Sequence, residues 1–271
     1  MPIPDAALCD CHAHIFGDPA QFPVAPGADY TPPSAAAEAY RQQLDALGVK
    51  RCVLVQPSVY ATDNRCLLDA LQQLGSEARG VAVIDSGTPL DELRAMHARG
   101  VRGIRLNTLA ANGPRLDELE SFERCIAELP WHLQVLLQPR TLLDAVAHLE
   151  RVACPLVLDH FASFTPDTSA RELDALFDLA ARKNNLWIKL SAPYLFSDCS
   201  TAALDRYRYF TERAVEVMPQ RLLWATDWPH TARGDKPIAT EDLHPLLANW
   251  VNDAALLQRI SVDNPATLYG F

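Results

Sequence analysis

The sequence predicts an α/β protein folded as a single (β/α)8 barrel of the TIM type over residues 1–271. Three observations support this fold class: short apolar runs rich in Val, Ile and Leu, an amphipathic stretch after each run, and eight repeats of that pair. Eight alternating units of this kind form a closed parallel sheet surrounded by helices. A doubly wound open sheet is the alternative, but no G-x-G-x-x-G sequence follows the first run.

Each predicted strand is short and mostly apolar, as expected for a parallel sheet that is covered on its outer face by helices. Each run is followed by polar residues or by Pro, which indicates where the strand ends. The predicted strands are residues 7–14, 51–56, 80–85, 101–107, 132–138, 155–160, 186–191 and 221–227.

The segments between these strands have apolar residues at spacings of three and four, which is typical of helices that bury one face. The last two segments continue the alternation to the end of the chain. The predicted helices are residues 34–47, 64–74, 90–98, 117–128, 141–151, 169–182, 203–217 and 241–260.

Composition and charge narrow the function classes. The chain has 49% hydrophobic residues and a net charge of −10, which argue for a globular core and against nucleic acid or an anionic membrane as partner. No apolar run of about 18 residues and no secretory signal occur, so we expect a cytoplasmic protein without a membrane partner. A small anionic substrate is compatible with locally concentrated arginines. The sequence does not indicate the oligomeric state.

The carboxyl ends of the strands build the active site in such barrels, and four residues at these ends stand out. His12 and His14 end the first strand, His160 the sixth and Asp227 the eighth. Three imidazoles and a carboxylate suit either one divalent metal ion or direct polarisation of a carbonyl group with activation of water. We therefore expect these four residues to be catalytic, and to be the ligands if a metal is present.

The alternation of side chains along a strand predicts which faces these residues occupy. It places Asp10 on the same face as His12 and His14, pointing into the barrel mouth. Cys9 and Cys11 fall on the opposite face, which suits packing against helices.

Six further polar residues follow strand ends and are candidates for substrate binding. Arg105 is the strongest, because a guanidinium group near the end of the fourth strand suits bidentate recognition of a carboxylate. Asn64 is also an expected helix N-cap, and Lys189 is expected either to line the barrel or to form a buried ion pair. The six candidates are Arg105, Ser58, Asn64, Arg140, His230 and Arg233.

Several motifs resemble one enzyme family in the same order along almost the whole chain. They are DCHAHIFG, FPVAPGADYTPP, GVRGIRLN, LVLDH, LWIKLS, LLWATDWPH and VDNPATLYGF. They look like those of the amidohydrolase-superfamily lactonases of the 2-pyrone-4,6-dicarboxylate hydrolase type, whose relatives act on sugar-acid lactones and sulfomuconolactone. The resemblance implies hydrolysis of a small carboxylated lactone, with Asp227 as the base and His12, His14 and His160 polarising the carbonyl.

Two departures from the wider superfamily bear on metal content. The fourth strand has no lysine to carbamylate, and the fifth ends in Gln138 where many members have histidine, so we do not expect a binuclear centre. The resemblance favours a reaction without a required cofactor, with one zinc ion as the alternative. A mononuclear zinc lactonase or a decarboxylase of the same superfamily is the alternative function.

Overall fold

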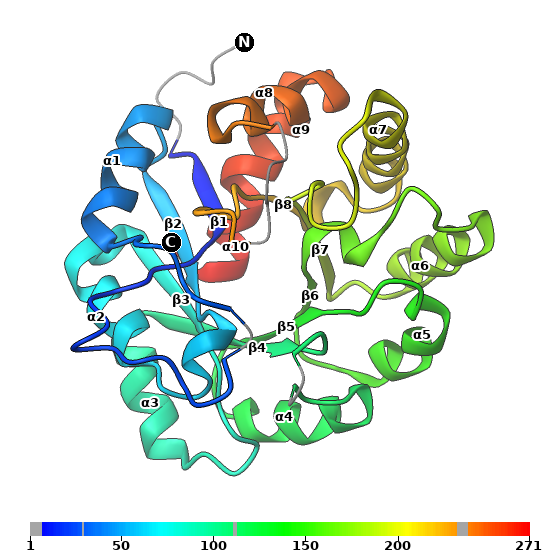
Figure 1. The fold of residues 1–271 in the computed structure, drawn as a ribbon. Helices are drawn as coiled ribbons and strands as arrows, with labels where there is room; N and C mark the ends of the chain where they lie inside the picture. The colour runs from blue at the N-terminus through cyan, green and yellow to red at the C-terminus, as the bar shows by residue number, and fades with distance from the viewer. Residues whose placement is uncertain (1–6, 29, 111–112, 232–237) are drawn as a thin grey trace.

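The computed structural model describes residues 7–28, 30–110, 113–231 and 238–271, and it confirms the predicted barrel (Figure 1). Eight strands form one sheet in the order β1 to β8, each parallel to its neighbour in sequence, and helices surround the ring. The strands are β1 Cys9–Ala13, β2 Arg51–Val55, β3 Ala78–Ala82, β4 Val101–Asn107, β5 His132–Leu136, β6 Leu156–Leu158, β7 Leu186–Leu190 and β8 Leu222–Trp224.

The helices from α1 to α9 lie within a few residues of the predicted segments, whereas α10 was not predicted, and the apolar faces of the surrounding helices are buried against the outside of the sheet. They are α1 Ala37–Leu47, α2 Arg65–Leu74, α3 Leu90–Ala98, α4 Leu119–Ile126, α5 Leu142–Arg151, α6 Ala170–Arg182, α7 Thr201–Val217, α8 Thr240–Val251, α9 Ala254–Gln258 and α10 Asn264–Tyr269. None of the helices in the described part of the chain is long and apolar enough to span a membrane.

Most element boundaries lie within three residues of the prediction, and two differences are larger in their effect. The third strand lies at Ala78–Ala82, two residues earlier than expected at its start. The helix expected at 241–260 is divided, because Asn252 adopts a left-handed conformation with φ of 47° and the Asp253 side chain caps a new helix. Such a break depends on the conformation of one residue, and the spacing of apolar residues does not predict that conformation.

The barrel interior is a packed apolar layer rather than a pore. Its inward-facing side chains come from alternate positions of the strands, and Tyr269 from α10 joins them. The Tyr269 ring packs edge-on against His132 of β5 at a centroid distance of 5.3 Å. The layer consists of Cys9, Cys11, Val53, Val55, Val81, Val157, Trp187, Leu223, Ala225 and Tyr269.

The first strand does not face the way its alternation predicts. Cys9 and Cys11 point into the barrel layer, and Asp10 points outward to contact α1, so the expected faces of these three residues are wrong. The pairing of β1 with β2 shifts register between Asp10 and Ala13. A bulge of this kind adds a residue and interrupts the alternation of side chains. His12 therefore points inward, as expected, although Asp10 does not share its face.

The barrel closes between β1 and β8 through the buried carboxylate of Asp10. Its Oδ1 atom accepts hydrogen bonds from the backbone nitrogens of His12 at 3.2 Å and Thr226 at 2.8 Å. Its Oδ2 atom accepts from the Thr226 hydroxyl at 2.5 Å and from the Tyr40 hydroxyl of α1 at 2.8 Å. One side chain thus joins the first strand, the end of the last strand and the outer helix.

Backbone bonds extend this closure toward the carboxyl end of the barrel. The Asp227 nitrogen donates to the His12 oxygen at 2.9 Å, and the His14 nitrogen donates to the Trp228 oxygen at 2.8 Å. Among the described residues, the link between these two strands is an isolated bridge from Ala13 to Trp228 rather than a full ladder. The closure consequently fixes the first-strand histidines beside Asp227.

Replacement of Asp10 with Ala should destabilise the protein by at least about 3 kcal/mol, because four buried donors would lose a charged acceptor. Urea unfolding followed by circular dichroism measures this change. The matched control is Asp45→Ala at an exposed position of α1, which should change stability by less than about 0.5 kcal/mol. Equal stability of the two variants would contradict the role of Asp10 in closing the barrel.

His132 should contribute to acid sensitivity. Burial lowers its pKa to about 3, below the value of about 6.5 expected in the unfolded chain. Between these values the unfolded state binds a proton that the folded state does not, so this contribution to stability is present above pH 6.5 and lost as the pH falls. In the His132→Leu variant, the free energy of unfolding should therefore depend less steeply on pH. Between pH 6 and pH 4 its slope should be smaller by about 1.4 kcal/mol per pH unit. An unchanged slope would contradict this assignment.

Candidate active site

The structure brings the four expected residues at strands 1, 6 and 8 together at the carboxyl end of the barrel. The Nε2 atoms of His12 and His14 are 3.3 Å apart. The Asp227 Oδ1 atom lies 3.6 Å from His12 Nε2, 3.9 Å from His14 Nε2 and 3.7 Å from His160 Nε2. We call these four residues the histidine–aspartate cluster. All four side chains are nearly or fully buried.

Each histidine of the cluster is oriented through its other ring nitrogen. His14 Nδ1 lies 2.7 Å from the Val55 carbonyl oxygen, which accepts a hydrogen bond from it. His160 Nδ1 lies 2.9 Å from the Ser191 hydroxyl oxygen. His12 Nδ1 lies 3.3 Å from both Asp159 Oδ1 and Lys189 Nζ. Because every Nδ1 atom has a partner outside the cluster, every Nε2 atom is directed into it.

Backbone strain accompanies two members of the cluster. His160 begins a run of four non-glycine residues with positive φ, extending from 50° at His160 to 59° at Ser163. Asp227 has a φ of 62°. Such conformations are costly for residues with a side chain and are found where a site requires an unusual direction of the backbone. Here they turn the ends of β6 and β8 over the mouth of the barrel.

Burial controls the charge of the cluster. It lowers the pKa of His14 to about 3 and of His160 to about 4, and it lowers the pKa of His12 well below its usual range. Burial also raises the pKa of Asp227 to about 7, although the hydrogen bond from Tyr194 acts in the opposite direction. The imidazoles are therefore neutral at pH 7, and Asp227 is close to its titration point, which suits an exchange of protons.

The second carboxylate oxygen of Asp227 is held from the loops beyond β7 and β8. The Tyr194 hydroxyl lies 3.0 Å from Asp227 Oδ2 and 2.7 Å from His230 Nδ1. His230 Nε2 in turn lies 2.6 Å from the Thr240 hydroxyl oxygen at the start of α8. His230, an expected substrate contact, thus acts on the cluster through Tyr194 in this structure.

A layer of buried polar side chains lies beneath His12, and we call it the polar floor. Lys189 of β7 donates to Gln134 Oε1 at 2.7 Å and lies 3.4 Å from Asp159 Oδ1. Asp159 Oδ2 accepts from Gln134 at 3.0 Å and from Arg105 Nε at 3.4 Å. Burial alone would raise the pKa of Asp159, but Lys189 and His12 hold it well below its usual range. The floor therefore contains an ionised carboxylate between two cations.

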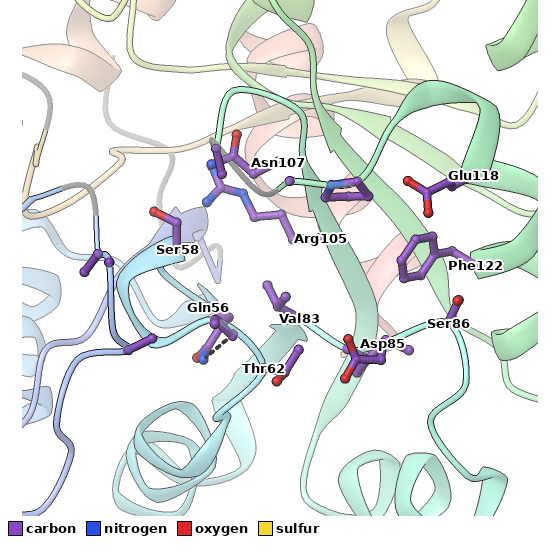
Figure 2. A pocket seen from close by; sticks show the side chains of 18 of the residues that line it. Gln56, Ser58, Thr62, Val83, Asp85, Ser86, Arg105, Asn107, Glu118 and Phe122 are labelled. Atoms are coloured by element: carbon purple, nitrogen blue, oxygen red, sulfur yellow. Dashed lines mark hydrogen bonds between the residues drawn. The ribbon is translucent and has the colours of Figure 1, made fainter.

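A cavity of about 520 Å³ lies at the carboxyl ends of β2, β3 and β4 (Figure 2). Arg105 and Ser58 line one side, Asp85 and Ser86 lie at the other end, and Glu118 approaches from the segment before α4. The four members of the cluster are not among the residues that line this cavity. Arg105 connects the two, because the same guanidinium group reaches the cavity and bonds to the polar floor.

The other expected substrate-binding residues have different positions. Ser58 lines the cavity, whereas the Asn64 amide bonds to the Val83 and Thr62 backbone and so holds the loops after β2 and β3 together. The Arg140 side chain is 73% exposed and pairs with Asp167 at 3.4 Å, so the structure does not bring it to the cluster. Arg233 lies outside the described residues.

Sequence reasoning did not select four residues whose side chains contact the cluster: Asp159, Lys189, Ser191 and Tyr194. Lys189 was expected to have a buried partner or to line the barrel, and its charge within an apolar strand is the signal for such a partner. Asp159 directly precedes His160 at a strand end. Tyr194 follows β7 in a loop with no recognisable pattern, so its contact with Asp227 required the fold.

His12, His14 and Asp227 of the cluster have the atom separations expected of ligands to one metal ion. Two ligands about 2.1 Å from a tetrahedral ion are about 3.4 Å apart, close to the separations of 3.3 to 3.9 Å measured here. His12, His14 and Asp227 form one group able to hold an ion, and His12, Asp159 and His160 form another. Asp159 Oδ1 is buried and has no well-oriented hydrogen bond among the described residues. It is placed to accept a hydrogen bond from His12 Nδ1–H when His12 Nε2 binds a cation.

Comparisons with known proteins agree with this architecture. A family profile described as Amidohydrolase matches residues 9–271. The chain is 33% identical to the 4-sulfomuconolactone hydrolase of Rhizobium radiobacter over 268 residues, covering 96% of this chain and 89% of the relative. It is also 33% identical to the 2-pyrone-4,6-dicarboxylate hydrolase of Comamonas testosteroni over 276 residues, covering 97% and 90% respectively.

Solved structures give the same result. The crystal structure of a probable 2-pyrone-4,6-dicarboxylic acid hydrolase from Acinetobacter baumannii, with citric acid bound, superposes with a TM-score of 0.86 at 28% identity. The match covers 98% of this chain and 100% of that one.

Proposed function

The chain belongs to the amidohydrolase family and is a hydrolase, and from this premise we propose that it opens a small carboxylated lactone by attack of water on the ring carbonyl. The observation that carries the proposal is the meeting of three neutral imidazoles with a carboxyl group whose pKa is about 7. Hydrolysis of a lactone needs these groups: a base for water, donors for the oxyanion and an acid for the leaving oxygen.

Asp227 acts first as the base. Its carboxylate takes a proton from the water as the water oxygen bonds to the carbonyl carbon, and His14 helps to hold that water through the lone pair on Nε2. Collapse of the tetrahedral intermediate breaks the bond from the carbonyl carbon to the ring oxygen. Asp227 then returns the proton to that oxygen, so the product carries one hydroxyl and one carboxylic acid group. The acid releases the second proton of the water to solvent and becomes a carboxylate.

His160 and His12 stabilise the oxyanion. When the Ser191 hydroxyl donates to His160 Nδ1, the Nε2–H group of His160 faces the reacting carbonyl. A donor of this kind lowers the barrier by about 3 to 4 kcal/mol. One divalent ion held by His12, His14 and Asp227 would supply a comparable polarisation as a Lewis acid.

Arg105 binds the carboxylate of the substrate. Its Nε bonds to Asp159, which orients the remaining guanidinium nitrogens, and its side chain reaches the cavity. Among the described residues that line this cavity, Arg105 is the basic one, and Asp85 and Glu118 are acidic. A second carboxylate would be repelled there, whereas hydroxyl groups would find acceptors, so the cavity favours a lactone with one carboxylate.

The first test is an assay of the purified protein against carboxylated lactones, with Asp227→Asn as the inactive variant. We expect hydrolysis by the wild type and a loss of kcat of at least about 100-fold in the variant, because an amide cannot accept the proton of water. The control is Asp205→Asn, an exposed residue of α7. The assignment of Asp227 fails if a folded variant retains the wild-type rate, and the proposed function fails if no lactone is hydrolysed.

A second test addresses the carboxylate. The Arg105→Lys variant should raise KM for an anionic lactone at least about tenfold, because a lysine cannot form the same bidentate contact. Arg140→Lys is the matched control at an exposed ion pair, and it should leave KM unchanged. An unaltered KM in Arg105→Lys would place Arg105 in a structural role.

A further inference from the structure

His12 Nδ1 has two partners that it cannot use at the same time. Lys189 Nζ lies 3.3 Å away and is a donor, whereas Asp159 Oδ1 lies 3.3 Å away and is an acceptor. A ring nitrogen without a hydrogen accepts from Lys189, and a ring nitrogen with a hydrogen donates to Asp159. All three side chains are fully buried, so solvent water does not replace either partner.

The choice of partner decides what His12 presents to the cluster. When Lys189 donates to Nδ1, the proton of the neutral ring is on Nε2. In the substrate-free site Nε2 then donates to His14 Nε2 across 3.3 Å, and both groups become free for water and the oxyanion when substrate separates them. His14 Nδ1 then donates to Val55, which completes a continuous chain of hydrogen bonds. In this arrangement His12 is a donor and offers no lone pair to a cation.

The other arrangement suits a cation. When His12 Nδ1 donates to Asp159 Oδ1, the Nε2 lone pairs of both His12 and His14 face the cluster. Asp159 Oδ1 gains the hydrogen bond that it otherwise lacks among the described residues. Lys189 keeps its bond to Gln134, so neither arrangement leaves the ammonium group without an acceptor.

We propose that Lys189 and Asp159 are opposing positioning residues that set the affinity of the histidine–aspartate cluster for a divalent cation. Lys189 favours the cation-free tautomer of His12, and Asp159 favours the cation-binding tautomer. The inference concerns the site of the proposed function, but it does not depend on which substrate that site hydrolyses.

Two substitutions with opposite expected effects test this proposal. The Lys189→Met variant should bind Zn²⁺ at least about tenfold more tightly than the wild type, because His12 loses the competing donor. The Asp159→Asn variant should bind Zn²⁺ at least about tenfold more weakly, because His12 loses its charged acceptor. Competition with a chromophoric chelator at fixed pH measures both dissociation constants without an activity assay.

The opposite signs separate positioning from a structural role. Damage to the polar floor would weaken Zn²⁺ binding in both variants, and that result, or no change in Lys189→Met, would overturn the proposal. Arg105 remains beside Asp159 in Lys189→Met, so its carboxylate keeps a cationic partner. Matched controls are Lys50→Met and Asp178→Asn at exposed positions, and they should leave the dissociation constant unchanged.

A measurement on the unaltered protein covers the case in which a variant does not fold. Long-range ¹H–¹⁵N spectra of the histidine rings report which nitrogen carries the proton, with His12 assigned by comparison with His12→Asn. We expect the Nε2–H tautomer of His12 without metal and the Nδ1–H tautomer after addition of Zn²⁺. A cation-free Nδ1–H tautomer would overturn the proposal. A failed lactone assay would leave both results standing and would count against the proposed function alone.

Discussion

The site depends on the closure of the barrel by the carboxylate of Asp10. Sheet pairing joins each strand to the next from β1 to β8, but the described residues of the first and last strands share an isolated bridge. Asp10 supplies the missing attachment through Thr226 and Tyr40. Because His12 lies two residues after Asp10 and Asp227 lies one residue after Thr226, closure and assembly of the cluster are one event. A buried acceptor with four donors is strong enough to hold such a closure.

The sequence was sufficient to predict the barrel, because that prediction uses the hydrophobic period and the number of repeats, which are local properties. It also placed His12, His14, His160 and Asp227 at strand ends that meet in this fold. It failed for the facing of Cys9 and Asp10, since a bulge changes the direction of side chains without changing composition. The divided eighth helix has the same origin in a single dihedral at Asn252.

The polar floor was beyond sequence reasoning for another reason. Its contacts join residues of β4, β5 and β7 with Asp159, which directly follows β6, and each contact depends on the stagger between strands in the closed barrel. A lysine within the apolar run of residues 186–191 indicates that some partner exists, yet three carboxylates and several amides are available near the strand ends. Only the assembled barrel identifies Asp159 and Gln134 as those partners.

Arg105 connects the polar floor to the cavity. Its guanidinium group bonds to Asp159, and Asp159 is one of the two alternative partners of His12 Nδ1. A ligand carboxylate that binds Arg105 from the cavity would weaken the interaction of Arg105 with Asp159. Asp159 would then interact more strongly with its remaining donors, Lys189 and His12. Under the two proposals above, occupancy of the cavity and the tautomer of His12 would be linked through one buried carboxylate, although Arg105 lines the cavity and His12 does not. The low polarity of the interior makes such a link effective over a short chain of charged groups.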